Sequence, residues 1–190
     1  MNPPSTPSGF RADRLGTLEE TAAGWELRFV RRLAKPPAVV WRAFVDPELV
    51  ARWFPTTIVG DLAAGAALRF DFTDVVADPF VGEVLEADEP RHLVFTWGGD
   101  VLRFDFAEAT TGTELTMTVI LDELGKAARD AAGWHECLDR LERSQSDAPD
   151  TAADRTWEQL HAAYVERFGP AASTLGPPQE FLDAQRDAGK

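Results

Sequence analysis

The sequence has almost no cysteine. Cys137 is the only one among 190 residues, so an internal disulfide and a cysteine-rich zinc site are both excluded. Nothing therefore points to an oxidising compartment. Cys137 falls on the apolar stripe of an expected helix. A small buried hydrophobe is the favoured interpretation there, because a reactive thiol needs exposure and a cationic neighbour.

Long hydrophobic runs are also missing. No apolar segment approaches the roughly 20 residues that a transmembrane helix needs. The first residues are rich in Pro, Ser and Thr and contain no hydrophobic stretch of the kind found in secretory signals. The sequence therefore predicts a soluble cytoplasmic protein that does not enter a membrane.

Positive charge is scarce. The chain has 32 acidic and 19 basic residues, a formal net charge of −13 and a pI of about 4.6. Binding to nucleic acid or to anionic lipid needs a concentrated basic surface, so neither partner is expected. Solubility is the simpler explanation of the acidic excess, and an acidic recognition surface is the alternative.

Catalytic and metal-binding motifs are missing as well. His92, His135 and His161 lie on separate expected elements, and all three are interpreted as surface residues. His135 is placed on the solvent side of its helix, and no histidine follows at zinc-binding spacing. No phosphate-binding glycine loop and no nucleophile elbow occurs. No catalytic residue, metal ligand or cofactor is therefore predicted.

What the chain does have is one long amphipathic pattern. Between Ala127 and Arg143 the apolar residues recur every three or four positions, which predicts a helix with a narrow apolar stripe. The stripe consists of Ala127, Ala131, Trp134, Cys137, Leu138 and Leu141. Gly133 beside Trp134 predicts a close approach of the helix backbone to a sheet, with the indole as a core anchor or cavity wall.

Upstream of this helix, short segments alternate between apolar and polar residues, as antiparallel strands with one solvated face do. They are residues 25–33, 67–73, 80–87, 92–97, 101–107 and 113–121, with 56–59 as a further short candidate. Two short helices interrupt the series after the first strand, the second of them capped by Asp46. The order predicts an α+β fold with the long helix on one face of a sheet of six or so strands.

The chain is expected to contain one domain with two appendages. Residues 1–23 are predicted to be mostly disordered, residues 24–146 to form the domain, and residues 147–190 to carry one further helix at about 152–168. The apolar stripe of that helix is Trp157, Leu160, Tyr164 and Phe168. Because such a stripe should not face water, it is expected to pack on the domain or on a second subunit, and a homodimer stays open.

Five segments together resemble a known family. They are residues 37–48, 53–55, 82–97, 112–116 and 133–141. Their order and spacing resemble the START-related helix-grip (SRPBCC) superfamily, in the branch similar to the C-terminal domain of the activator of the heat-shock-protein-90 ATPase. The resemblance implies a curved antiparallel sheet wrapped on the long helix around a cavity that often binds an apolar ligand. It implies no single function, because members include chaperone cofactors, lipid carriers and cyclases.

The inward positions of the expected strands are rich in aromatic residues and poor in charge, which predicts an apolar cavity between helix and sheet. Its expected walls are Trp53, Phe54, Phe70, Phe72, Trp97, Phe104, Phe106, Met117, Trp134, Cys137 and Leu138. An ordinary filled core would give the same pattern.

Three functions follow in order of preference. The first is a non-enzymatic domain that binds a small apolar ligand or a protein partner. The second is an enzyme of the cyclase, dehydratase or hydrolase type acting in the same cavity, which would need a buried charged residue at an inward strand position. The third is a co-chaperone-like role with a chaperone partner, for which the sequence shows no charged docking surface.

Overall fold

The structure is a computed structural model that describes residues 14–72, 77–146 and 155–177. Within these residues, eight strands form one antiparallel sheet in the order β1-β2-β8-β7-β6-β5-β4-β3. The strands are β1 Thr17–Thr21, β2 Gly24–Leu33, β3 Thr57–Val59, β4 Ala67–Asp71, β5 Phe80–Asp88, β6 His92–Trp97, β7 Asp100–Ala109 and β8 Gly112–Leu121. The expected α+β class is confirmed, with eight strands where six or so were expected.

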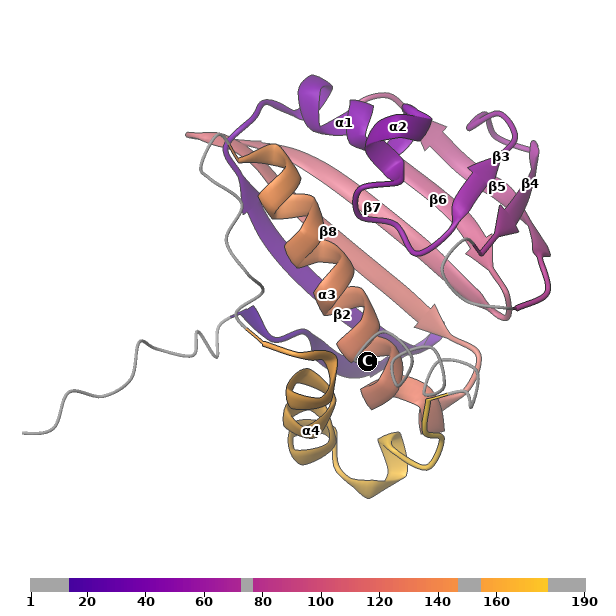
Figure 1. Cartoon of the computed structure of the whole chain (residues 1–190), viewed down its shortest axis with the longest axis vertical. Coiled ribbons are helices and arrows are strands. Elements are labelled where there is room, and N and C mark those ends of the chain that lie inside the picture. Colours follow the sequence, from indigo (N-terminus) through magenta and orange to yellow (C-terminus); the bar gives the residue numbers. More distant parts are fainter. Residues whose placement is uncertain (1–13, 73–76, 147–154, 178–190) are drawn as a thin grey trace, which may run out of the picture.

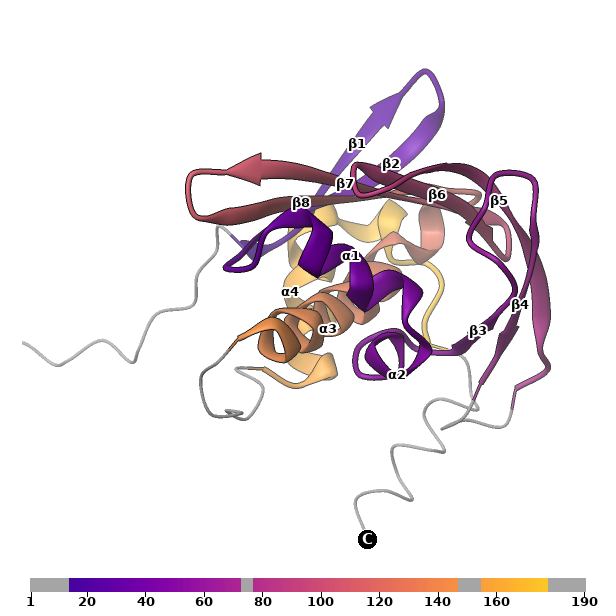
Figure 2. The same cartoon turned by 90° about the horizontal axis from the view of Figure 1, so that it is seen from above.

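The helices lie together on one face of this sheet. The long helix α3, Ala127–Gln145, crosses the face diagonally, and the short helices α1, Pro37–Val45, and α2, Pro47–Val50, cover its other half (Figure 1). Figure 2 shows that β5, β4 and β3 bend round towards the helices, so that the sheet is curved. No helix among the described residues lies on the opposite face of the sheet.

Strict alternation along the central strands builds the core. On β7, Leu102, Phe104 and Phe106 are buried, and Phe104 pairs with Met117 of β8. Successive side chains on a strand point to opposite faces, so these apolar residues all meet the helices. The core therefore lies between the curved sheet and α3, as predicted by the alternation of the strands and by the three-to-four spacing of the helix.

The inserted helices close the second half of this core. Asp46 accepts a hydrogen bond from the backbone N–H of Glu48 at 3.1 Å and so caps α2. The Phe44 ring packs edge-on against Phe104, with their centroids 5.0 Å apart. Trp53 donates its indole N–H to the carbonyl oxygen of Ala43 at 2.8 Å. The space between these helices and the sheet is thus filled by aromatic side chains.

The prediction of disorder over residues 1–23 is wrong for its last part. Strand β1 pairs with β2 along its whole length, with Leu18 opposite Leu27. The Pro- and Ser-rich composition that indicated disorder is confined to the first residues, which lie outside the described part of the chain. Composition averaged over the segment hid the short strand.

The C-terminal extension packs on the domain. Helix α4, Trp157–Phe168, begins at a capping box between Thr156 and Gln159 and ends at Gly169, whose φ is +80°. Its apolar stripe is turned towards α3, and Trp157, Leu160 and Tyr164 are buried. The expectation that the stripe packs on the domain is confirmed. The residues before Thr156 that were also expected to be helical lie largely outside the described residues.

Candidate functional site

A pocket of about 470 Å³ lies between α3 and the bent half of the sheet. One of its walls is aromatic and draws on five elements or their ends. The residues of this aromatic wall are Phe72, Phe80, Trp97, Trp134 and Trp157. The volume falls in the range of small-molecule sites in proteins, which is roughly 300–1,000 Å³.

The aromatic wall is assembled by edge-to-face ring contacts. Trp97 at the end of β6 lies 5.6 Å from the Trp134 ring on α3 and 4.7 Å from Phe80 on β5. Trp134 is 6% exposed and also contacts Phe54, at 5.7 Å between centroids. Such pairs add about 0.5–1.5 kcal/mol beyond the area that they bury. Trp134 is therefore both a core anchor and a pocket wall, as the sequence allowed.

Gly133 serves a different purpose from the one its sequence position predicts. A Cβ atom at Gly133 would meet no heavy atom within 4 Å, so the expected close approach to the sheet is wrong. Gly133 lines the pocket instead. In a helix interior glycine costs about 0.5–1 kcal/mol relative to alanine, so the residue leaves space in the pocket at the expense of helix stability.

The second wall of the pocket is ionic. Its charged residues are Asp100, Lys126, Arg129, Asp130, Glu136 and Arg140. Lys126 Nζ lies 2.7 Å from Asp100 Oδ1 and 2.5 Å from Oδ1 of Asp122, which is outside the pocket. Arg129 pairs with Asp130 at 2.6 Å. Each carboxylate of this wall therefore has a cation beside it.

Burial shapes the protonation of this ionic wall. It raises the pKa of the Asp100 and Asp130 carboxyls, against the effect of the neighbouring cations. Burial also acts to lower the pKa of Lys126, but hydrogen bonds to Asp100 and Asp122 outweigh it and raise that pKa. Lys126 therefore stays protonated at neutral pH and compensates the buried carboxylate of Asp100.

The far end of the ionic wall is a weaker pair. Arg140 lies 3.8 Å from Glu136 one turn earlier on α3, and its guanidinium is 3.9 Å from Cys137 Sγ. Burial raises the pKa of the Cys137 thiol to about 12. The thiol is therefore protonated at neutral pH, consistent with its interpretation as a small hydrophobe rather than a nucleophile.

Only some of the residues that were expected to line a cavity line this pocket. Phe72, Trp97, Trp134 and Cys137 line it. The remaining expected wall residues are not part of its lining but pack in the hydrophobic core beside it: Trp53, Phe54, Phe70, Phe104, Phe106, Met117 and Leu138. The centre of the expected cavity is thus filled by side chains, and the free space lies at its edge.

The sequence interpretation missed the charged half of the site. Asp100 is only 3% exposed and shares the inward side of β7 with Leu102 and Phe104. The alternation of that strand, extended by one residue towards its start, would have placed a carboxylate on the inward face. Its partner Lys126 comes from the turn before α3, and no sequence pattern joins the two.

His135 is also placed differently from its prediction. It is 6% exposed, and its Nδ1 atom lies 2.8 Å from the hydroxyl of Tyr164 on α4. The prediction of a surface residue is wrong because α4 covers the side of α3 that would otherwise face water. Arg31 on β2 is similarly buried, at 3% exposure.

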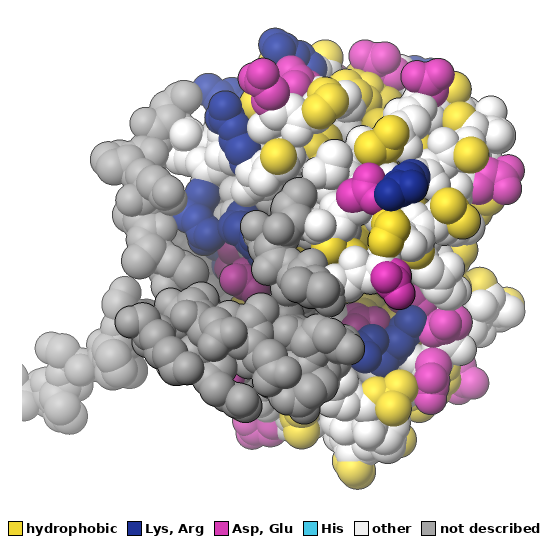
Figure 3. All heavy atoms as spheres, turned by 45° about the vertical axis from the view of Figure 1, so that its right-hand side comes forward, with side chains coloured by type: hydrophobic (Ala, Val, Ile, Leu, Met, Phe, Trp, Pro, Cys, Tyr) yellow, Lys and Arg dark blue, Asp and Glu magenta, His cyan; other side chains and the backbone are white. Residues whose placement is uncertain are grey.

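Outside the pocket, exposed hydrophobic side chains are dispersed. Val81 is the most exposed of the large ones, at 76%. On the face shown in Figure 3, hydrophobic side chains of the described residues are interspersed with acidic, basic and neutral ones. None of the described helices is long and apolar enough to cross a membrane. No group of three or more His, Cys, Asp or Glu residues suited to a metal ion occurs in the described part.

Comparison with known proteins identifies the family. A family model described as activator of Hsp90 ATPase homolog 1-like protein matches residues 34–144. A search of curated proteins by sequence finds no match.

Several solved structures share the fold. A conserved protein of unknown function from Enterococcus faecalis is 21% identical, with a TM-score of 0.68 over 80% of this chain and 90% of its own. CalU16 from Micromonospora echinospora is 22% identical, with a TM-score of 0.61 over 81% and 93%. An AHSA1-like protein from Aeromonas hydrophila is 22% identical, with a TM-score of 0.55 over 66% and 99%. Identities this low establish the fold alone, which is the helix-grip fold. Since the family model spans more than half of the chain, the chain belongs to the activator of Hsp90 ATPase homolog 1-like family.

Proposed function

We propose that this chain is a small-molecule-binding protein whose ligand occupies the pocket between α3 and the bent half of the sheet. The observation that carries the proposal is the unfilled space of about 470 Å³ beside a core that is packed with aromatic side chains. Protein interiors are ordinarily close-packed. An unfilled space of this size costs the domain packing energy. Its aromatic wall could regain that energy by contact with a ligand.

Gly133 on α3, which also lines the pocket, supports the same function. Gly133 forgoes a side chain at a position where the structure has room for one. Any larger residue would project into the pocket from α3, and most would also favour the helix. The choice of glycine therefore favours free pocket volume over helix stability.

The charges of the pocket favour an uncharged ligand. Among the described lining residues, the carboxylates of Asp100, Asp130 and Glu136 are matched by Lys126, Arg129 and Arg140. A charged ligand would leave one charge of the desolvated site without a partner, which is costly. The net charge of −13 adds a further penalty for anions such as fatty acids. A flat aromatic molecule without charge fits both walls.

A matched set of three ligands tests this proposal. The set is 2-naphthalenemethanol, 2-naphthoate and 2-naphthylmethylamine, which share one aromatic body and differ in charge. Burying roughly 200 Å² of apolar surface gains about 5 kcal/mol, which corresponds to a Kd of the order of 0.2 mM. We expect the alcohol to bind at about this strength, with amide chemical-shift changes at Gly98, Gly99 and Gly133, and the two ions to bind at least about ten-fold more weakly.

A filled pocket provides the control. Gly133→Leu places a side chain in the open space, so this variant should fold as the wild type does and lose the alcohol. If none of the ligands, nor larger uncharged aromatics, changes the spectrum of the wild type, the proposal fails. A protein-binding scaffold would then be the better interpretation, and ATP hydrolysis by purified Hsp90 with and without the chain would be the next measurement.

One observation favours a second candidate, an enzyme acting in the same pocket. Asp100 is a buried carboxyl at an inward strand position, and burial raises its pKa, as in many general acids and bases. Its carboxylate is nevertheless held by Lys126 and by the backbone N–H of Asp122 at 3.0 Å. Mass spectrometry of a bound ligand distinguishes the two functions. An enzyme would change the ligand's mass with the wild type and leave it unchanged with Asp100→Asn.

A further inference from the structure

The family-matched residues end at 144, yet the pocket extends beyond them. Trp157, the first residue of α4, and Pro177 both line it. Between them the chain folds back over the start of α3, where Leu175 donates its backbone N–H to the carbonyl oxygen of Gly125 at 3.0 Å. Residues 155–177 thus contribute two lining residues to the pocket from outside the family match.

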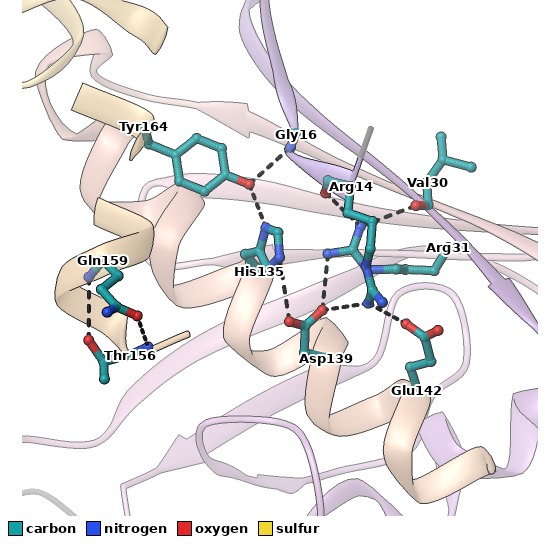
Figure 4. Close-up of polar contacts among 10 residues, drawn as sticks. All are labelled: Arg14, Gly16, Val30, Arg31, His135, Asp139, Glu142, Thr156, Gln159 and Tyr164. Carbon is teal, nitrogen blue, oxygen red and sulfur yellow. Dashed lines mark hydrogen bonds and ion pairs between the residues drawn. The ribbon is translucent and has the colours of Figure 1, made fainter. Parts of the chain in front are cut away.

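A buried polar chain fixes α4 in this position (Figure 4). The hydroxyl of Tyr164, on a residue with no exposed surface, accepts a hydrogen bond from the Gly16 backbone N–H at 2.9 Å. It also lies 2.8 Å from His135 Nδ1 on α3. Beyond His135, Asp139 accepts from Arg14 at 2.8 Å and pairs with Arg31 of β2 at 3.4 Å. Four segments of the chain therefore meet around one tyrosine.

The directions of these hydrogen bonds follow from chemistry. The Gly16 backbone N–H can only donate, so the Tyr164 hydroxyl accepts from it and keeps its own proton available for His135 Nδ1. The other ring nitrogen of His135, Nε2, lies 3.4 Å from Asp139. In the tautomer that carries the ring proton on Nε2, Nδ1 accepts from the Tyr164 hydroxyl. Burial raises the pKa of Tyr164 to about 12, which keeps that proton on the hydroxyl. Losing the hydroxyl would remove the partner that both His135 Nδ1 and the Gly16 N–H have in Tyr164.

Trp157 is set in place by the start of the same helix. The Thr156 hydroxyl accepts from the Gln159 N–H at 3.4 Å, and the Gln159 side chain accepts from the Thr156 N–H at 3.1 Å. The Trp157 ring stacks on His161 with their centroids 4.8 Å apart and their planes at 21°. The capping box and the stacking on His161 therefore hold the Trp157 ring against the pocket at the start of α4. Tyr164 anchors the same helix two turns later.

We propose that the C-terminal extension is the ligand-selecting wall of the pocket. In this arrangement Trp157 is the specificity-determining residue, and the Tyr164–His135 hydrogen bond positions it. The inference rests on the proposed small-molecule function and adds which part of the chain sets the size of the ligand. Without the Trp157 ring the pocket widens on this side, so larger flat molecules gain relative to small ones.

The test compares two uncharged probes, 2-naphthalenemethanol and the larger flavone, by calorimetric titration of the full chain. Trp157→Ala should weaken binding of the alcohol about ten-fold, which corresponds to about 1.4 kcal/mol, and raise the flavone-to-alcohol affinity ratio by a similar factor. Trp157→Phe should stay within about three-fold of the wild type. Tyr164→Phe keeps the ring and removes only the hydroxyl; it should weaken the alcohol about three-fold and speed hydrogen exchange of the α4 amides.

Leu160→Ala is the matched control, because Leu160 is buried on α4 at 2% exposure but does not line the pocket. The inference predicts that this variant loosens α4 without changing the affinity ratio. An equal change of the ratio in Leu160→Ala and Trp157→Ala would overturn the specificity role, as would an unchanged ratio in Trp157→Ala. In either case the wild type would still bind the alcohol and the proposed function would stand. A wild type that binds neither probe would overturn both.

Discussion

Gly133→Ala should stabilise this protein, although it adds an atom to the middle of its central helix. The residue has no positive φ, and a Cβ built on it meets nothing within 4 Å. The substitution therefore incurs neither backbone strain nor a clash. What remains is the difference in helix propensity, about 1 kcal/mol in favour of alanine.

Urea denaturation measures the effect. With an m value of about 2 kcal/mol/M, the midpoint should rise by about 0.5 M while m stays constant. The melting temperature should rise by about 2–4 °C for a chain of this size. The same methyl group enters the pocket, so affinity for 2-naphthalenemethanol should fall while stability increases. Opposite changes in stability and affinity are the expected sign of a residue selected for pocket volume.

Gly82→Ala is the contrasting variant. A Cβ atom at Gly82 would overlap the carbonyl oxygen of Thr96 on the neighbouring strand, so this substitution should destabilise the protein by about 1–3 kcal/mol. If Gly133→Ala lowered the midpoint as Gly82→Ala does, the helix backbone would have to approach another part of the protein closely at Gly133. The reasoning about the pocket would then be refuted.

Three further results are expected. Trp134→Ala should cost about 3–5 kcal/mol in urea denaturation, because it removes a buried indole that contacts Phe54 and Trp97, and a loss below about 1 kcal/mol would contradict this burial. Truncation after Ser146 should lower the melting temperature, because it exposes the α3 surface that α4 covers. Unchanged melting and unchanged sedimentation would contradict this prediction. Burial acts to raise the pKa of Asp139, but its hydrogen bond to a histidine and nearby arginines lower it overall. The stability from this low pKa is present above the unfolded aspartate value of about 3.9 and is lost as the pH falls through the folded value, so Asp139→Asn should show a shallower acid slope in pH-dependent melts.

The sheet and its helix could be predicted because their signals are local. The alternation in β7 and β8 and the three-to-four spacing in α3 each depend on neighbouring residues only, and the structure reproduces their bounds closely. Strand β1 lacked such a signal, because five residues with one leucine alternate too briefly to stand out from a Pro-rich segment. The segment forms a strand because it pairs with the free edge of β2, and this pairing belongs to the tertiary structure rather than to the local sequence.

The pocket could be predicted only in part, because aromatic residues at inward positions serve a core and a cavity equally well. Trp53 and Trp134 are the same residue type, and both were expected to line the cavity. One donates its indole N–H to Ala43 in the packed interior, and the other borders free space. Which of them does so depends on how the sheet curves round the helices, and no local residue pattern encodes that curvature. The ionic wall needed a contact between β7 and the turn before α3, which local periodicity cannot supply.

The burial of His135, in contrast, was within reach of the sequence. Helix α4 carries an apolar stripe that must be covered, and α3 follows the sheet with only one face committed to it. Two amphipathic helices joined by a short connection pack against each other, so the second face of α3 was the nearest available surface. A histidine on that face and Tyr164, the one tyrosine of the chain, on the opposing stripe are a donor–acceptor pair that burial would require to meet. The prediction that His135 faces solvent considered α3 alone. The apolar stripe of α4 already implied that the outer face of α3 is covered.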